Sequence, residues 1–235
     1  MALLEVNDMH TYIGPFYILQ GVSFKAEKGM ATVLLGRNGA GKTTTLRSIM
    51  GMTPPKSGKI LFKGKEITKL PTYKIARMGI AYVPSKRRIF GHLTIEENFK
   101  LAFRSRELSF EDRLNFILDT FPDLKDNLKT NARNLSGGQQ KMLLIASAMI
   151  NKNELLLVDE PSEGLSPILI KKFTETLAKL KEEITIILVE QNFKMAKKIG
   201  DVGYILDMGR IVFQGSMEEV AGNEEILKRH LGVSI

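Results

Sequence analysis

Cysteine is absent from this chain of 235 residues. The absence excludes disulfide frameworks, thiolate metal sites and cysteine nucleophiles, and it suits a reducing compartment. No apolar run approaches the roughly 18 residues that a membrane-spanning helix needs, and Glu5 and Asp8 near the N-terminus are unlike a secretory signal. We therefore expect a cytoplasmic protein that associates with a membrane only through a partner.

The charge balance is basic, with 34 Lys and Arg residues against 26 Asp and Glu residues and a formal net charge of +8. This excess permits anionic partners such as nucleotides, nucleic acid or an anionic membrane surface. Because basic and acidic residues are interspersed, most of them are expected to be solvated surface charges. The length is that of one large domain or two small ones, with a substantial core.

Residues Gly36 to Thr43 fit the phosphate-binding pattern G-x-x-x-x-G-K-[ST] at every fixed position. The apolar run Ala31–Leu35 before them is typical of a buried strand, and Thr44–Met50 after them of a helix. Glycines let backbone N–H groups approach phosphates closely, and the helix N-terminus adds unpaired donors. Lys42 is expected to reach the β- and γ-phosphates, and the Thr43 hydroxyl to hold Mg²⁺. The predicted loop consists of Gly36, Arg37, Asn38, Gly39, Ala40, Gly41, Lys42 and Thr43.

Short apolar segments predict strands that alternate with helices. The stretch from Leu93 to Ile150 has a helical pattern, with a capping box at Thr94–Glu97 and an interruption at Phe121-Pro122, and Ser166-Pro167 predicts a further helix start. This order favours an α/β fold with a mostly parallel sheet covered on both faces and an inserted helical lobe. The predicted strands are Leu3–Val6, Val22–Lys25, Met30–Leu35, Gly58–Phe62, Ile80–Val83, Leu155–Val158 and Ile184–Val189.

Two carboxylates, Asp159 and Glu160, directly follow the apolar strand Leu155–Val158. Parallel sheets of this class bind ligands at the carboxyl ends of their strands. Asp159 is therefore expected to hold Mg²⁺ beside the phosphate loop, directly or through water, and Glu160 to orient and deprotonate an attacking water. Because a strand followed by an acidic turn is common, this pattern alone is weak evidence for a nucleotide site. It becomes strong evidence because a phosphate loop precedes it in the sequence.

The segment Leu135–Gln140 reads Leu-Ser-Gly-Gly-Gln-Gln. Ser136 and Gln139 form the pattern of a capping box for the helix that follows. Capping does not explain Gly137 and Gly138, since glycine weakens the first helical turn. A bare helix N-terminus is useful where a second phosphate group must bind.

Together, Gly36–Thr43, Leu135–Gln139 and Leu155–Glu160 resemble the nucleotide-binding domain of ABC ATPases, over essentially the whole chain. Further motifs are similar to those in the ATPase subunits of branched-chain amino-acid importers. The ATPases of urea or amide importers carry similar motifs, so that alternative stays open. The motifs are Gly79–Pro84, Arg88–Phe90, Leu93–Asn98, Asp159–Pro167, Leu188–Asn192 and His230–Gly232.

The resemblance implies a single nucleotide-binding domain over residues 1–235. Within it, 1–85 and 151–235 would form the ATP-binding core with an N-terminal antiparallel β subdomain, and 86–150 a helical signature subdomain. Two such domains would form a head-to-tail dimer with two ATP molecules between them, and Ser162–Leu165 matches a dimer-contacting loop. The resemblance places the phosphate loop, Thr44 and Asp159 at the nucleotide in cis, and Ser136, Gly137, Gly138 and Gln139 at the partner's nucleotide.

Three further positions are assigned by the resemblance. Tyr12 is the best match to the aromatic residue that stacks on adenine, with Phe16 and Tyr17 as alternatives. Ser85 stands where the family usually has a glutamine near Mg²⁺; because serine is shorter, its expected metal contact is through water. Gln191 stands where most of the superfamily has a histidine, and it can donate a hydrogen bond to the γ-phosphate but cannot carry a charge.

The function that the resemblance implies is ATP hydrolysis, with Mg²⁺, that energises an importer. Its expected partners are a second ABC ATPase subunit, two transmembrane permease subunits and an external solute-binding protein. One rival is a soluble ABC-type ATPase that acts on nucleic acid, but such proteins usually carry a coiled coil or a tandem ATPase domain, so no nucleic acid is expected. A second rival is a non-hydrolytic subunit, against which the intact Glu160 argues.

Overall fold

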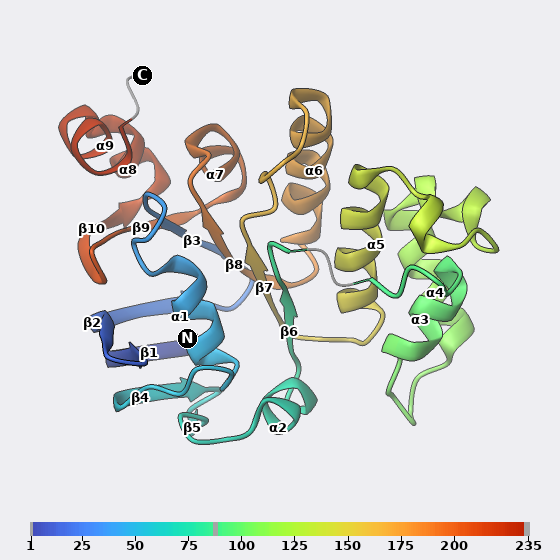
Figure 1. Cartoon of the computed structure of the whole chain (residues 1–235), viewed down its shortest axis with the longest axis horizontal. Helices are drawn as coiled ribbons and strands as arrows, with labels where there is room; N and C mark the ends of the chain where they lie inside the picture. Colours follow the sequence, from blue (N-terminus) through green and yellow to red (C-terminus); the bar gives the residue numbers. More distant parts are fainter. Residues whose placement is uncertain (1, 87–88, 233–235) are drawn as a thin grey trace.

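The protein is described from a computed structural model, which covers residues 2–86 and 89–232 (Figure 1). Arg88, part of one motif quoted above, lies outside the described residues. The strands are β1 (Ala2–Ile13), β2 (Phe16–Glu27), β3 (Ala31–Leu35), β4 (Ser57–Phe62), β5 (Lys65–Glu66), β6 (Ile80–Val83), β7 (Leu155–Asp159), β8 (Thr185–Glu190), β9 (Val202–Asp207) and β10 (Arg210–Ser216). The α-helices are α1 (Lys42–Ile49), α2 (Thr72–Arg77), α3 (Ile95–Ala102), α4 (Phe110–Thr120), α5 (Gly137–Met149), α6 (Pro167–Leu180), α7 (Phe193–Ile199), α8 (Met217–Gly222) and α9 (Glu224–Leu231), and the 3₁₀ turns are η1 (Pro122–Asn127) and η2 (Ala132–Asn134).

The central sheet has the strand order β10-β9-β3-β8-β7-β6. Neighbouring strands from β9 to β6 are parallel, whereas β10 pairs antiparallel with β9. Every residue of β3, β7 and β8 is buried, because helices cover both faces of the sheet. Successive side chains alternate between the two faces: Leu34 packs in one core with Leu46 of α1, and Val33 in another with Leu177 of α6. The predicted α/β fold with a mostly parallel sheet is confirmed.

A second, antiparallel sheet has the order β2-β1-β4-β5. Its first two strands are far longer than the predicted segments Leu3–Val6 and Val22–Lys25, since each has 12 residues. The register between β1 and β2 shifts near Asp8, which has a positive φ of 49°. This bulge lets Val6 and Met9 both be buried although they are three residues apart. The interrupted alternation explains why the sequence pattern predicted strands that were too short.

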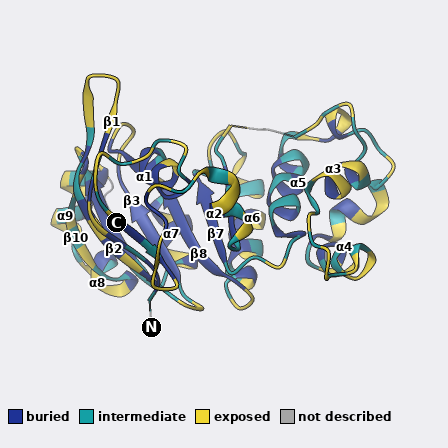
Figure 2. Cartoon of the chain, turned by 90° about the horizontal axis from the view of Figure 1, so that it is seen from below, coloured by how far each residue is buried: buried dark blue, intermediate teal, exposed yellow. Residues whose placement is uncertain are grey.

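The helices α3, α4 and α5 lie together at one side of the central sheet (Figures 1 and 2). The predicted capping box begins α3: the Glu97 N–H donates to Thr94 Oγ1 at 3.2 Å, and the Thr94 N–H donates to Glu97 Oε2 at 2.7 Å. The predicted interruption is also present, because α4 ends at Thr120 and η1 begins at Pro122.

The C-terminal elements were not predicted from the sequence. Strand β9 pairs in parallel with β3 on the side opposite to β8, so β3 lies inside the sheet. In residues 2–86 and 89–232, no helix is both long and apolar enough to cross a membrane.

Candidate functional site

The loop between β3 and α1 carries the phosphate-binding motif, and glycine is sterically required at two of its positions. A Cβ atom on Gly36 would lie 2.4 Å from the carbonyl oxygen of Leu206, far inside contact distance. Gly41 has a φ of 108°, and a Cβ there would lie 2.7 Å from the Leu19 side chain. The loop can therefore pass close to β9 and β2 and still turn into α1, as a phosphate cradle requires.

Lys42, the first residue of α1, is buried at 3% exposure. Its Nζ atom donates to the carbonyl oxygens of Gly36 at 2.8 Å and Arg37 at 3.1 Å, and it pairs with Glu160 Oε1 at 2.8 Å. The ammonium group thus lies at the mouth of the loop, where it can move onto a phosphate.

A cavity of about 200 Å³ opens over this loop. Its volume is below the range of roughly 300–1,000 Å³ for pockets that bury a whole ligand of moderate size. It can therefore hold phosphate groups, while the rest of a nucleotide would lie outside it. The residues that line it are Ile18, Gly39, Gly41, Lys42, Thr43, Thr44 and Glu160.

Asp159 ends strand β7 beside the loop and is almost completely buried. Its carboxylate accepts hydrogen bonds from Thr43 Oγ1 at 2.9 Å and from the Tyr82 hydroxyl at 3.0 Å, and the Ser85 backbone N–H also donates to it. Burial raises the pKa of Asp159, and the nearby charge of Glu160 adds to the rise, while these donors oppose it.

This group of residues fits a magnesium ion. Thr43 and Asp159 supply a hydroxyl and a carboxylate oxygen, the ligand type that Mg²⁺ prefers. In the described part of the chain, no group of three or more His, Cys, Asp or Glu side chains could hold a metal. That agrees with magnesium sites of nucleotide enzymes, which use one or two protein groups and complete the shell with substrate phosphates and water. Ser85 reaches Asp159 through its backbone, so its side chain stays a predicted, untested contact of the metal.

Glu160 follows β7 and has a φ of 43°, a conformation uncommon for a residue with a side chain. Its N–H donates to the carbonyl oxygen of Val189 in β8 at 3.0 Å, which holds the backbone in place. The side chain then points toward Lys42 and lines the cavity. Gln191 follows β8 at the same edge of the sheet and is exposed. The structure therefore brings Glu160, Lys42, Thr43 and Asp159 together.

The glycine-rich segment Ser136–Gln139 lies at the start of α5. Its predicted capping box is present: the Gln139 N–H donates to Ser136 Oγ at 3.3 Å, and the Ser136 N–H donates to Gln139 Oε1 at 3.0 Å. A Cβ on Gly138 would lie 2.7 Å from a methyl carbon of Leu169 in α6. Part of the glycine requirement is thus close packing, which sequence reasoning missed. None of these residues lines the cavity over the phosphate loop.

Tyr12 lies near the end of the β1–β2 hairpin and does not line that cavity. Its ring stacks on Tyr17 with centroids 4.5 Å apart and an angle of 4° between the planes, and the Lys56 Nζ lies 5.1 Å from its ring centroid. Phe16 is 68% exposed, whereas Ile18 lies at the cavity itself. An adenine contact of Tyr12 stays a prediction, and it would have to compete with these contacts.

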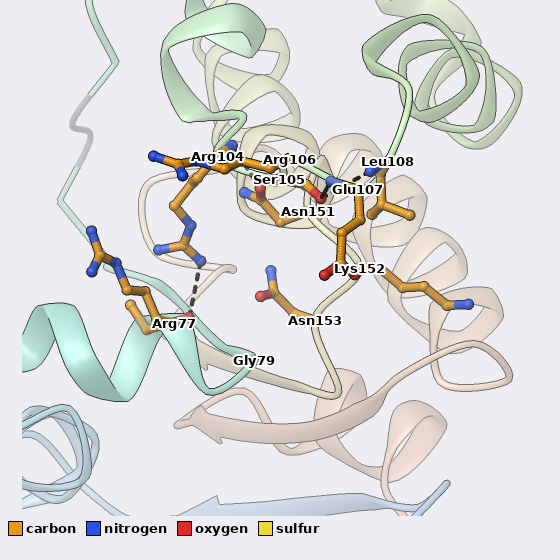
Figure 3. Close-up of a pocket in the computed structure, with 11 residues that line it drawn as sticks. Arg77, Gly79, Arg104, Ser105, Arg106, Glu107, Leu108, Asn151, Lys152 and Asn153 are labelled. Atoms are coloured by element: carbon orange, nitrogen blue, oxygen red, sulfur yellow. Dashed lines mark hydrogen bonds between the residues drawn. The ribbon is translucent and has the colours of Figure 1, made fainter.

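A further pocket lies elsewhere, between the α3–α4 connection and the start of β6 and β7 (Figure 3). Its volume is about 810 Å³, and it contains several basic residues. Arg104 donates to the Ala76 carbonyl oxygen at 3.0 Å, while Arg77 and Lys152 point to opposite sides in Figure 3. None of the site residues predicted from the sequence lines this pocket.

Sequence reasoning assigned no role to three polar residues of the site. Tyr82 contacts Asp159, Glu190 contacts Ser162 and the backbone of Gln191, and Lys141 contacts the loop after Glu160. Glu190 and Lys141 are buried charged residues. The sequence does not show that these two side chains are buried. For Glu190 there is one signal, because a charged residue at the end of an apolar strand can indicate a functional site.

Residues 19–163, more than half of the chain, match the family described as ABC transporter. The chain belongs to the ABC transporter family. It is 38% identical over 232 residues to the high-affinity branched-chain amino acid transport ATP-binding protein BraG of Pseudomonas aeruginosa, which covers 98% of this chain and 100% of that protein. It is also 38% identical over 220 residues to the probable branched-chain amino acid transport ATP-binding protein LivF of Archaeoglobus fulgidus, covering 92% and 93% of the two chains.

The fold of this ABC protein also matches solved structures. A nucleotide-free ATP-binding cassette from an ABC transporter superposes with a TM-score of 0.87 at 23% identity and covers 100% of both chains. The predicted family and fold are therefore confirmed, and the protein is an ABC-type ATPase subunit. The roles of its individual site residues stay predictions.

Proposed function

We propose that this protein binds ATP with Mg²⁺ and hydrolyses it to energise the import of branched-chain amino acids. The observation that carries the chemistry is the cluster of Lys42, Thr43, Asp159 and Glu160 around a glycine loop at the carboxyl edge of a parallel sheet. The similarity to BraG along the whole chain carries the choice of solute.

In the proposed reaction, water attacks the γ-phosphate and releases ADP and inorganic phosphate. Lys42 leaves Glu160 and binds the phosphates, and Glu160 then accepts the proton of the attacking water. Backbone N–H groups between Gly36 and Thr44 hold the phosphates, so the protein supplies positioning and charge stabilisation rather than a covalent intermediate. Gln191 donates one hydrogen bond to the γ-phosphate.

Thr43 and Asp159 would hold the magnesium ion. When bound, the ion neutralises charge on the phosphate oxygens. Tyr82 and the Ser85 N–H orient the Asp159 carboxylate toward Thr43. This support from neighbouring residues keeps a ligand carboxylate in one geometry.

We further propose a head-to-tail dimer with a second ABC ATPase subunit, in which Ser136–Gln139 of each chain faces the partner's nucleotide. The absence of these residues from the cavity in their own chain supports this arrangement. The BraF and LivG proteins are also related to this chain at 30% identity, which favours a sister ATPase as the partner. Two permease subunits and an external solute-binding protein would complete the importer, with this chain at the inner face of the membrane.

The assembly part of the proposal is tested by light scattering of the Glu160→Gln variant with and without Mg-ATP. We expect a monomer that forms a dimer, with itself or with the sister ATPase, when Mg-ATP is added. A stable dimer that forms without nucleotide and leaves Ser136–Gln139 exposed would contradict the arrangement.

The solute is tested by transport. The tagged protein is purified with its membrane subunits and reconstituted in liposomes with the solute-binding protein, and ATP-dependent uptake of labelled leucine, urea and a short amide is measured. Uptake of leucine is expected, whereas uptake of urea or the amide alone would favour the alternative importer. ATP turnover stimulated by DNA or RNA at moderate salt, without transport, would refute the importer.

A further inference from the structure

Glu190 lies between the two strands that carry the catalytic groups. It is the last residue of β8, is 1% exposed and pairs with Leu35, which directly precedes the phosphate loop. On the other side, its neighbour Val189 pairs with Asp159. The carboxylate is therefore buried at the edge of the sheet where the nucleotide would bind.

Four donors satisfy this carboxylate, and they come from two different loops. The Ser162 N–H donates to Oε1 at 2.8 Å, and the Ser162 hydroxyl donates to Oε2 at 2.9 Å. The N–H groups of Gln191 and Asn192 each donate to Oε2 at 2.9 Å. Because hydrogen bonds to a buried carboxylate are strong, Glu190 fixes the loop after Glu160 and the peptide of Gln191 relative to each other.

Lys141 also holds this loop, through two of its carbonyl oxygens. It lies in α5, two residues after Gln139, and is 6% exposed. Its Nζ donates to the carbonyl oxygens of Pro161 at 2.7 Å and Glu163 at 2.6 Å. Continuous polar contacts thus join the helix that begins with Ser136–Gln139 to the turn that carries Gln191.

We propose that Glu190 is a positioning residue for ATP hydrolysis, which sets Gln191 at the γ-phosphate according to the position of Ser162. The inference rests on the proposed function, since it takes Gln191 to contact the phosphate and residues 162–165 to contact the partner subunit. When a partner subunit holds the Ser162 loop in place, Gln191 would be aligned with the γ-phosphate. When the loop is displaced, Gln191 would move away from the γ-phosphate. Lys141 transmits the position of the glycine-rich helix start to the same loop.

The test uses the assembled transporter and measures kcat and KM for ATP. The Glu190→Gln variant keeps the shape of the side chain but replaces one acceptor oxygen with an N–H₂ donor. That donor must face either the Ser162 N–H or the donors on the other oxygen, so at least one hydrogen bond is lost. We expect kcat to fall roughly tenfold, and by no more than in Gln191→Ala, with KM changed by no more than about twofold. The matched control is Glu218→Gln, an exposed acid in α8, which is expected to leave both constants unchanged.

A double-mutant cycle separates positioning from a loss of stability. If Glu190 acts through Gln191, Glu190→Gln lowers kcat little further in a Gln191→Ala background. The inference would be overturned if the fold-changes in kcat of the two single variants multiply in the double variant, or if a folded Glu190→Gln variant has the wild-type kcat. Thermal unfolding checks the fold, and if Glu190→Gln is unfolded, Ser162→Ala takes its place in the same cycle.

The two proposals fail in different ways. Failure of the proposed function is seen in the wild-type complex, as an absence of ATP-driven transport. If only the role of Glu190 is wrong, the wild-type complex is fully active, and Glu190→Gln and Gln191→Ala lower kcat independently of each other.

Discussion

Lys42 and Glu160 form an ion pair, with 2.8 Å between Nζ and Oε1, and the lysine side chain is 3% exposed. The cation that would bind the phosphates is thus paired with the carboxylate that would accept the proton. An incoming phosphate must compete with Glu160 for Lys42. Once it succeeds, the carboxylate is released from its partner and becomes available as a base.

The first prediction concerns Glu160→Gln. The neutral amide competes less for Lys42, so ATP affinity is expected to stay the same or rise, while hydrolysis falls by about 10²–10⁴ because the general base is lost. Isothermal titration and a phosphate-release assay measure the two effects, with Glu218→Gln as the control. Full turnover by Glu160→Gln would remove Glu160 as the base.

The second prediction concerns Lys42→Ala. This change removes the buried cation and leaves the carbonyl oxygens of Gly36 and Arg37 and the Glu160 carboxylate without their shared donor. We expect most ATP affinity to be lost, since the phosphate charge then meets an unpaired carboxylate. Isothermal titration measures the ATP affinity, and Lys69→Ala, which changes an exposed lysine outside the site, is the control. Wild-type affinity in Lys42→Ala would contradict the assignment.

Much of the site could be predicted because its residues are contiguous in the sequence. The loop Gly36–Thr43 and the pair Asp159 and Glu160 each follow an apolar strand, and strands of a parallel sheet end at one edge. The roles of Tyr82 and Glu190 could not be predicted, because their hydrogen bonds join residues 77 and 28 positions apart. The bulge near Asp8 likewise broke the alternation on which the strand prediction depended.

The third prediction compares Gln191→Ala with Glu160→Gln in the assembled complex. Gln191 is an uncharged donor, and one hydrogen bond is worth about 0.5–1.5 kcal/mol, or up to about 3 with a charged partner. Turnover should therefore fall roughly tenfold, and at most about a hundredfold. Equal inactivity of Gln191→Ala and Glu160→Gln would mean that Gln191 organises the attacking water, and Glu160 could then no longer be the dominant group.

The fourth prediction concerns acid stability through the capping box of α3. The backbone N–H of Thr94, together with its hydroxyl, lowers the pKa of Glu97 from its ordinary value of 4.5. Since the folded pKa is the lower one, the stabilisation is fully present above pH 4.5 and is lost as pH falls through the folded pKa. Glu97→Gln should therefore melt below the wild type at neutral pH, and the two melting temperatures should converge in acid. Glu225→Gln, another exposed first-turn acid, is the control; a pH-independent difference would contradict the prediction.

The last prediction separates two reasons for Gly138 in the glycine-rich segment. A Cβ at this position would lie 2.7 Å and 2.9 Å from the two methyl carbons of Leu169, so Gly138→Ala should lower the melting temperature unless that side chain moves. Leu169→Ala removes these atoms, and the double variant Gly138→Ala/Leu169→Ala should be less destabilised than the sum of the two single changes.

Hydrolysis by the assembled complex then decides whether packing is the whole reason. If Gly138 is also needed at the partner's nucleotide, the double variant is more stable than that sum predicts but still hydrolyses ATP slowly, because removing the Leu169 side chain relieves only the clash with α6. Leu169→Ala alone supplies the control for activity. A double variant as active as Leu169→Ala would show that Gly138 is needed for packing against α6 and not for the nucleotide.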